Sequence, residues 1–277
     1  MQQYLQLVDE TFDYNFTQEY HLSIQFSLDG FSFCIRDGLQ NKYVYLFHKE
    51  FSGNPKFLHR KLNDIYTEFE ILKADFKTVQ IICATPGKMV LVPENFFSDQ
   101  QASKNYGLNL DLSDEDELSY LPLKKHRSIL QFAIPAKVKR FFEDKYPGVL
   151  IQNELVNQLN KAETNSGSAE TINAQLYKSQ LTITLAGNSL RFCNSFKYRN
   201  DNDLLYYILH VAKMAEDNQN LQICLNGRVN KRSAIYHHLR QYFKNVHVES
   251  RSKETYYSYL FDQLPDARFV NLLNNLL

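Results

Sequence analysis

Residues 22–35 read LSIQFSLDGFSFCI, and the order of the neighbouring elements can be worked out from this segment. Apolar side chains alternate with polar ones from Leu22 to Leu28, and the alternation resumes at Phe31. A period of two residues is typical of a strand with one buried face, and an Asp-Gly pair is typical of a two-residue hairpin turn. The segment therefore predicts two antiparallel strands joined at Asp29 and Gly30.

Three further elements are predicted after this hairpin. A third strand is expected over 43–51, and a buried strand over 79–83. Between them lies a helix whose apolar residues recur at helical spacing, namely Phe57, Leu58, Leu62, Ile65, Tyr66, Phe69 and Leu72. The predicted order is strand, strand, strand, helix, strand, and the last strand is expected to run beside the first.

A similar order recurs in the second half of the chain. Alternating residues at 181–185 predict a strand, Gly187 and Asn188 a turn, and residues 189–197 one or two further strands. The later predicted elements are a helix over 203–216, a strand over 221–225, a second helix over 231–243 and a short strand over 246–248. Two copies of one supersecondary unit predict two similar lobes.

The remaining segments complete the predicted domain organisation. Residues 1–160 are expected to form the first lobe, with a polar insertion near 98–127 that is helix or loop at the surface, and residues 172–277 the second lobe. Residues 161–171 (KAETNSGSAET) have no large apolar side chain and are expected to be the linker. The end of the chain is expected to be helical after Asp266, either packed against a lobe or available to bind a partner.

The composition is that of a soluble globular protein. Lys plus Arg and Asp plus Glu number 31 each, and 44% of the residues are hydrophobic. A neutral chain lacks the basic surface of a protein that binds nucleic acid or an anionic membrane, so we expect neither partner. No apolar run approaches the roughly 20 residues that span a bilayer, and residues 1–10 do not resemble a secretory signal. We therefore expect a cytoplasmic protein with no membrane span.

Glycine is scarce and widely spaced in the chain. There are 9 glycines, where average usage of about 7% would give roughly 19, and no two are closer than Gly30 and Gly38. The dinucleotide-binding fingerprint, the phosphate loop, the kinase glycine-rich loop and the Gly-x-Ser-x-Gly elbow each need two glycines within about six residues. These four classes of enzyme are therefore excluded.

The cysteines do not form a zinc-binding pattern. Cys34, Cys83, Cys193 and Cys224 lie far apart, none belongs to a Cys-x-x-Cys pair, and His-Glu-x-x-His does not occur. All of them fall in predicted strands, so we expect buried free thiols and no metal site.

The two units, each with a glycine in its first hairpin, resemble the actin-like ATPase (ribonuclease H-like) fold. The run LSIQFSLDGFSFCI and the ending FDQLPDARFVNLL (residues 261–273) are similar to a family of uncharacterised bacterial proteins of unknown function thought to share that fold. The resemblance covers most of the chain. It implies a duplicated α/β fold with two lobes, each a mixed sheet flanked by helices, and it implies no activity. More distant relatives by fold include cytoplasmic actin-like adaptors of pilus and secretion machines.

The motifs that bind nucleotide in this fold are altered in the chain. The ATPases carry Asp-x-Gly in the first hairpin, with the Asp near magnesium and the turn amides on phosphate. Here Asp29 and Gly30 are neighbours, and Phe31 stands where a small residue would let phosphate approach. In the corresponding second turn Ala186 replaces a second acidic residue. The adenosine-binding turn normally has paired glycines, and LNGR at 225–228 has one.

No catalytic or metal-ligating residue is expected on these grounds. If nucleotide binding is retained, its contacts are expected at the two hairpin turns and the later turn, that is at Asp29, Gly30, Gly187, Asn188 and Gly227. Simpler structural explanations exist. Asp29-Gly30 suits a type I′ hairpin turn, and Gly227 suits a tight turn from strand to helix.

The sequence favours an interaction protein over an enzyme. Because the nucleotide motifs are not intact, the protein is expected to be a scaffold that needs no cofactor. It is expected to hold an unknown protein partner, either in the cleft between the lobes or on its C-terminal segment. Arg228, Lys231 and Arg232 gather beside a predicted helix start, where they could hold phosphate or an acidic partner, or be solvated. The alternatives use ATP and magnesium. One is an atypical phosphotransferase with Asp29 on magnesium and Gly227 under the base, and the other a protein that binds nucleotide without hydrolysis.

Overall fold

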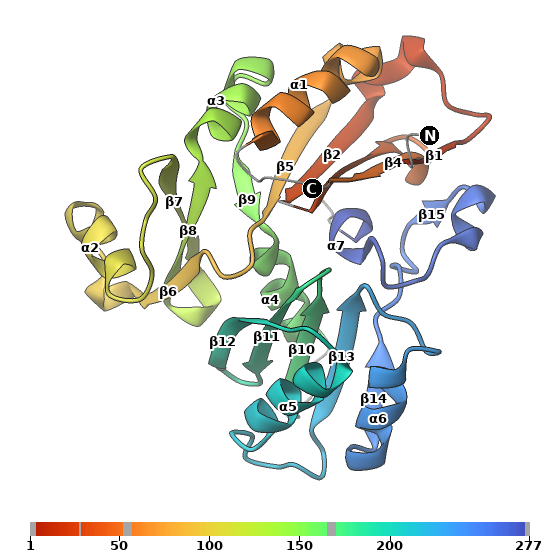
Figure 1. Cartoon of the computed structure of the whole chain (residues 1–277). Coiled ribbons are helices and arrows are strands. Elements are labelled where there is room, and N and C mark those ends of the chain that lie inside the picture. Colours follow the sequence, from red (N-terminus) through yellow and green to blue (C-terminus); the bar gives the residue numbers. More distant parts are fainter. Residues whose placement is uncertain (1–3, 28, 52–56, 165–169, 275–277) are drawn as a thin grey trace.

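The chain folds around two mixed sheets, and the structure, a computed structural model, describes residues 4–27, 29–51, 57–164 and 170–274 (Figure 1). One sheet, called here the N-terminal sheet, contains β1 (Tyr4–Val8), β2 (Tyr20–Ser27), β3 (Gly30–Asp37), β4 (Lys42–Glu50), β5 (Thr78–Ala84), β9 (Ile151–Asn153) and β15 (Tyr256–Tyr257). Its strand order is β1-β4-β3-β2-β5-β9, and β15 pairs with β4. The other, the C-terminal sheet, contains β10 (Thr171–Leu176), β11 (Gln180–Ala186), β12 (Leu190–Lys197), β13 (Gln222–Gly227) and β14 (Asn245–Val248). Its order is β12-β11-β10-β13-β14.

Both sheets have the same pairing pattern at their centre. An antiparallel hairpin, β2–β3 or β10–β11, is extended on its other side by a strand parallel to the first one, β5 or β13. The predicted order of elements is confirmed in the N-terminal half, where α1 (Leu58–Glu68) lies between β4 and β5. In the C-terminal half α5 (Asp201–Ala212) lies between β12 and β13, but the first strand is β10, which was not predicted.

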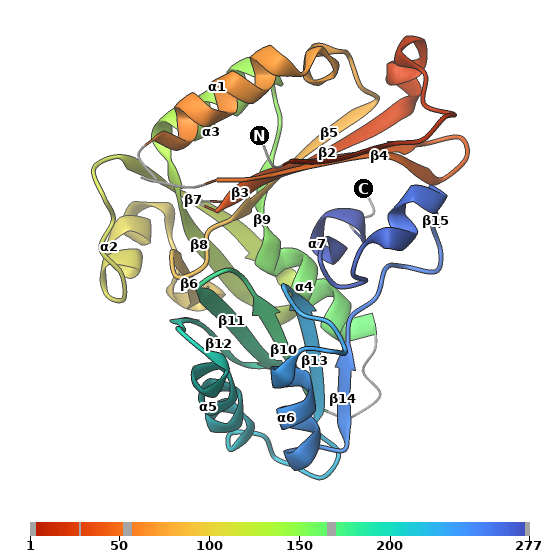
Figure 2. The same cartoon turned by 45° about the vertical axis from the view of Figure 1, so that its right-hand side comes forward.

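Aromatic side chains fill the core under the N-terminal sheet. Phe26, Phe31 and Phe33 are fully buried. They pack with Leu62 and Ile65 of α1, which lies beside α3 (Ala136–Lys145) on one face of the sheet (Figure 2). Burying each such side chain stabilises the fold by roughly 2–3 kcal/mol. The alternation read from the sequence therefore sets which face of β2 and β3 is covered by helices.

Two helices lie between the sheets, and two cover the outer face of the C-terminal sheet (Figure 2). The inner helices are α4 (Glu154–Thr164) and α7 (Val270–Leu273), and the outer ones are α5 and α6 (Ala234–Tyr242). Because α4 runs to Thr164, residues 161–164 of the expected linker are helical. Residues 165–169 lie outside the described ranges, and β10 begins at Thr171.

The expected surface insertion contains part of a third sheet. β6 (Met89–Pro93), β8 (Ser128–Pro135) and β7 (Asp116–Leu123) pair in the order β6-β8-β7. Two acidic residues of the insertion, Asp116 and Glu117, lie in β7 and make ion pairs: Lys88 Nζ lies 2.6 Å from Asp116 Oδ2, and Lys139 Nζ lies 3.1 Å from Glu117 Oε2. The expectation of helix or loop was therefore wrong for residues 116–123.

The C-terminal segment is buried against the N-terminal sheet. Phe261, Leu272 and Leu273 form a cluster with Tyr43 and Leu46 on the sheet face away from α1. The helix expected after Asp266 is limited to α7, whose side chains are all buried. Of the two alternatives for this segment, packing is confirmed, and α7 has no free face with which to bind a partner.

The other helices are short. They are α2 (Ala102–Gly107) and the 3-10 segments Tyr14–Glu19, Glu70–Lys73, Glu94–Phe96, Asp99–Gln101, Lys124–His126 and Tyr259–Gln263. Among the helices that the structure describes, none combines the length and the apolar character required to cross a membrane.

Candidate functional site

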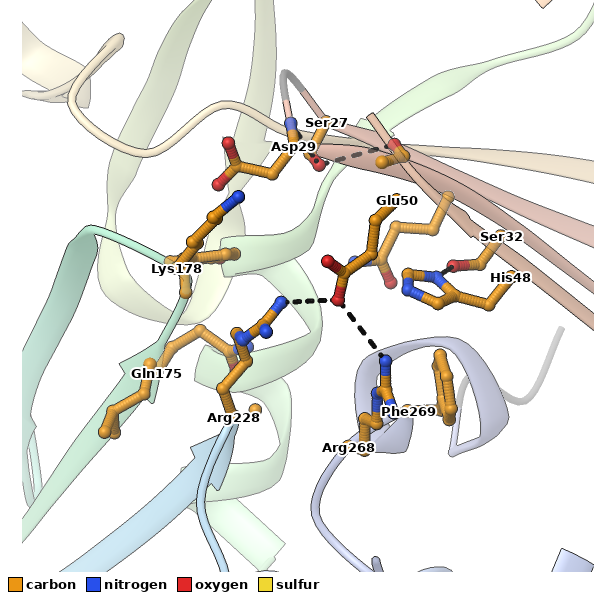
Figure 3. A pocket seen from close by; sticks show the side chains of 15 residues that line it. Ser27, Asp29, Ser32, His48, Glu50, Gln175, Lys178, Arg228, Arg268 and Phe269 are labelled. Carbon is orange, nitrogen blue, oxygen red and sulfur yellow. Dashed lines mark hydrogen bonds and ion pairs between the residues drawn. The ribbon is translucent and has the colours of Figure 1, made fainter. Parts of the chain in front are cut away.

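A pocket of about 90 Å³ lies between the two sheets, and we call it the central pocket (Figure 3). Its lining comes from five segments: the β2–β3 hairpin, the end of β4, the β10–β11 turn, the residues after β13, and the C-terminal segment. The lining residues are Gln25, Ser27, Asp29, Gly30, Ser32, His48, Glu50, Gln175, Leu176, Tyr177, Lys178, Gly227, Arg228, Arg268 and Phe269.

Three of the five predicted site residues line this pocket. Asp29, Gly30 and Gly227 meet there, whereas Gly187 and Asn188 lie in the β11–β12 turn and are not part of the lining. The turn that faces Asp29 from the C-terminal sheet is the one after β10, and Figure 3 shows Lys178 of this turn beside the Asp29 carboxylate. The predicted repeat was therefore displaced by one hairpin, because β10 was not predicted as a strand.

The close approach of β3 to β4 requires a residue without a side chain at position 30. Gly30 is the first residue of β3 and pairs with Glu50, and a Cβ atom at this position would lie 2.9 Å from the Lys49 carbonyl oxygen. Gly30 does not have a positive φ, so the expected type I′ turn, which needs one at both of its central residues, is wrong. The Asp29 amide donates to Ser27 Oγ at 3.1 Å, and this N–H is thus not free to bind a phosphate.

Phe31 does not obstruct the pocket. Successive side chains of β3 point to opposite faces, so Gly30 and Ser32 line the pocket while Phe31 is buried on the other face. There its ring lies against those of Phe33 and Tyr66. The expectation that Phe31 stands in the way of a phosphate was therefore wrong.

Gly227 makes the tight turn that follows β13. Its φ is +85°, and a Cβ atom would lie 2.3 Å from the Leu176 carbonyl oxygen. The Gly227 N–H donates to Ala267 O at 3.0 Å, and the Arg228 N–H donates to Leu176 O at 2.9 Å. The structural interpretation of Gly227 is confirmed, and both amides of the turn are already hydrogen-bonded within the protein.

Charged side chains bridge the sheets across the pocket. Glu50 Oε1 lies 2.9 Å from Arg228 Nη1 and 3.5 Å from Arg268 Nη2 (Figure 3). Burial raises the pKa of Glu50, but the hydrogen bond and the positive charge of Arg228 outweigh this effect and leave the pKa below its ordinary value. Burial and the nearby Arg228 lower the pKa of Arg268. Of these residues only Arg228 was singled out from the sequence.

His48 contributes a neutral imidazole to the pocket. Its Nδ1 lies 2.8 Å from Ser32 Oγ, and its ring meets the Phe269 ring at 5.3 Å. Burial, assisted by the positive charge of Arg268, lowers the pKa of His48 to about 4. Its Nε2 is buried with no hydrogen-bond partner among the described residues.

A layer of polar side chains lies beneath the pocket. Asn271 of α7 donates from Nδ2 to Gln175 Oε1 at 3.0 Å and to Glu154 Oε2 at 3.5 Å. Glu154, the first residue of α4, is buried, and burial raises its pKa to about 8 in spite of the hydrogen bond from Asn271. The Glu154 carboxyl group is therefore mainly protonated at neutral pH.

The residues present do not fit a nucleotide. Three of the turn amides that could bind phosphate are used within the protein, and Asp29 faces a lysine where a second carboxylate would be needed. A volume of about 90 Å³ holds a few water molecules, while small-molecule pockets measure roughly 300–1,000 Å³. The described residues also contain no group of three or more His, Cys, Asp or Glu side chains placed to hold a metal ion. The pocket instead suits a small group that accepts hydrogen bonds.

Comparisons with known proteins support the fold. A family model described as "Protein of unknown function (DUF3822)" matches residues 9–246. A Bacteroides thetaiotaomicron protein with an actin-like ATPase fold and unknown function is 24% identical, with a TM-score of 0.77 over 86% of this chain and 94% of that one. A structure of the PilM-PilN type IV pilus biogenesis complex matches at 9% identity with a TM-score of 0.62, covering 91% of this chain and 96% of that one. No curated protein matches the chain. The actin-like ATPase fold expected from the sequence is thereby confirmed.

Proposed function

The chain belongs to the DUF3822 family of proteins of unknown function, and from this premise we propose that it is a non-catalytic protein of the actin-like fold that acts by binding another protein. The observation that carries the proposal is the bridge from Glu50 to Arg228 and Arg268. These side chains bridge the sheets at the central pocket, where members of the fold that are ATPases bind nucleotide. A protein whose own charged groups occupy this space has no need of ATP to hold its two halves together.

The architecture we propose has two lobes that arose by duplication. Residues 1–160 form the first lobe, residues 172–277 the second, and residues 161–171 the connection. The common pairing pattern of the two sheets supports the duplication. In this proposal the protein lies in the cytoplasm and has a protein partner, and the neutral composition argues against a role in binding nucleic acid.

A protein partner is also consistent with the fold comparisons. The structure of PilM with PilN is that of a complex, and its fold is similar to that of this chain over most of its length. At 9% identity the likeness concerns the fold alone. It supports the idea that a protein of this architecture can serve by holding another protein, without indicating which one.

The test is a pair of measurements on the purified full chain with magnesium ATP. Calorimetry should detect no binding at micromolar protein, and phosphate release should equal the buffer control. Micromolar binding or turnover that is lost in Asp29→Ala would refute the proposal. Asp262→Ala, which removes a carboxylate outside the central pocket, is the matched control, because it should not change either measurement.

A second candidate is a nucleotide-dependent protein, and one observation favours it. The Asp29 carboxylate lines the pocket and makes no hydrogen bond or ion pair with the other described residues. An acidic side chain left without a partner in this position is consistent with an ATPase or phosphotransferase, or with a protein that binds nucleotide without hydrolysis. Binding abolished by Asp29→Ala in the calorimetric experiment would support this candidate.

A further inference from the structure

Two guanidinium groups in the central pocket share one carboxylate oxygen. The guanidinium groups of Arg228 and Arg268 both contact Glu50 Oε1, and neither guanidinium makes another hydrogen bond with the described residues (Figure 3). A guanidinium has several N–H donors and binds a carboxylate best through two parallel hydrogen bonds. Most of this capacity is unused here, and two positive charges face the single negative charge of Glu50.

A third donor group lies beside these arginines. When the Ser32 hydroxyl donates to Nδ1 of His48, the ring carries its proton on Nε2, the atom that has no partner among the described residues. A buried polar atom without a hydrogen bond costs free energy, and a ligand oxygen placed nearby would recover part of it. His48 comes from the N-terminal sheet, Arg228 follows the C-terminal sheet, and Arg268 belongs to the C-terminal segment.

Glu50 occupies the pocket only loosely. It is the last residue of β4, and 41% of its side chain is exposed, so the side chain can turn into solvent without crossing the packed core. An ion pair between groups as exposed as Glu50 and Arg228 shifts an equilibrium by no more than about fivefold. The carboxylate of another molecule can therefore replace that of Glu50 at small cost.

We propose that the central pocket binds a glutamate side chain of a partner protein, which takes the place of Glu50 between Arg228 and Arg268. The inference rests on the proposed function, because it names the chemistry by which the partner is recognised. Glu50 itself demonstrates that a γ-carboxylate fits between the two guanidinium groups. A glutamate side chain reproduces the single charge and the planar pair of oxygens that Glu50 presents to the guanidinium groups, whereas a phosphate dianion changes both.

The test uses the full chain and N-acetyl-L-glutamic acid α-amide, whose only charge is the side-chain carboxylate. Binding is followed through the NMR resonances of the arginine side-chain N–H groups. Because Glu50 competes with the probe through a weak, exposed ion pair, Glu50→Gln should bind it about two- to fivefold more tightly than the unmodified protein. The neutral analogue N-acetyl-L-glutaminamide should bind to neither protein.

Further variants locate the binding site. Adding Arg228→Gln or Arg268→Gln to Glu50→Gln should abolish binding of the probe. Adding Lys244→Gln, which removes an exposed positive charge outside the pocket, should leave the affinity unchanged. If Arg228→Gln does not fold, Arg228→Lys replaces it. This variant keeps the charge but loses the paired hydrogen bonds, so its affinity should be intermediate.

Three results would overturn the inference: equal affinity of the probe for the unmodified protein and for Glu50→Gln, equal binding of the glutaminamide, or tighter binding of inorganic phosphate than of the probe. Magnesium ATP, titrated in parallel, tests the proposed function separately. Nucleotide binding would refute that function. If neither the nucleotide nor the probe binds, only the present inference is refuted.

Discussion

The Glu50 carboxylate and the Arg228 guanidinium meet at 2.9 Å, although the two residues are 178 positions apart in the chain. Glu50 ends a strand of the N-terminal sheet, and Arg228 follows a strand of the C-terminal sheet. The contact therefore joins the two halves of the molecule across the central pocket. Its energetic and functional consequences can be measured one at a time.

Removing the Glu50 carboxylate should have a small, salt-dependent effect on stability. Glu50 and Arg228 are 41% and 46% exposed, so solvent screens their attraction. We expect Glu50→Ala to lower the free energy of unfolding, measured by urea denaturation, by no more than about 1 kcal/mol. The difference should shrink in 1 M salt, because the screening length is then only about 3 Å. A loss of several kcal/mol, or one that salt does not change, would contradict this view of the contact.

Gly227 should be far less tolerant of substitution than a second glycine with a similar backbone conformation. In Gly227→Ala the new Cβ atom would lie 2.3 Å from the Leu176 carbonyl oxygen, and φ is +85°. We expect a loss of roughly 3 kcal/mol or more in the free energy of unfolding. Gly148→Ala is the matched control, because φ is +79° and nothing lies within 4 Å of the added atom, so it should cost only about 1 kcal/mol. Equal losses in the two variants would show that the contact with Leu176 does not matter.

The buried Glu154 should make stability depend on pH. Its pKa is about 8 in the folded protein and lies near the ordinary value of 4.5 in the unfolded chain, so the folded state holds the proton more tightly. The stability contributed by Glu154 is therefore fully present below about pH 4.5 and is lost as the pH rises toward 8. Glu154→Gln, which is neutral at every pH, should remove this component.

The comparison of the two proteins in urea at pH 6 and pH 8.5 measures the component directly. Between these values the unmodified protein should lose more stability than Glu154→Gln, and at pH 8.5 the variant should be the more stable of the two. Other titrating groups are common to both proteins and cancel in the difference. Parallel pH profiles would show that the Glu154 carboxyl group is not held in its protonated form.

The cysteine thiols should react slowly in the native protein. Cys34, Cys83 and Cys224 are buried in strands, and Cys193 is partly buried. Burial raises the pKa of Cys83 and of Cys193 to about 12, so the reactive thiolate form is scarce at neutral pH. A disulfide-exchange reagent should titrate all 4 thiols in guanidinium chloride, but at most Cys193 at an appreciable rate under native conditions. Rapid reaction of a second thiol would contradict the packing described for these strands.

The elements predictable from the sequence are those with a strong local pattern. The hairpin β2–β3, the helix α1 and the strand β5 were predicted because their apolar residues repeat at strand or helix spacing over many positions. β10 was missed although Ile172, Ala174 and Leu176 alternate with polar residues. The strand is short, one of its buried side chains is an alanine, and it directly follows a polar stretch. This omission displaced the predicted second turn from Lys178 to Gly187.

The central pocket was only partly predictable, for a different reason. Asp29, Gly30 and Gly227 could be identified because turn residues leave a local signature in the sequence. Glu50, His48 and Arg268 have no such signature. They become a site only when strands and turns distant in the chain are brought together. Their charge and hydrogen-bonding capacity were visible in the sequence, whereas their contact with Arg228 depends on the tertiary fold.

A crystal grown with a non-hydrolysable ATP analogue and magnesium provides the most direct measurement of whether the protein's own side chains occupy the space between the sheets. Our account predicts that Glu50 will be found between Arg228 and Arg268 in that crystal, with no analogue density in the central pocket. Density for the analogue beside Asp29 and Gly227, with Glu50 displaced from the arginines, would contradict it.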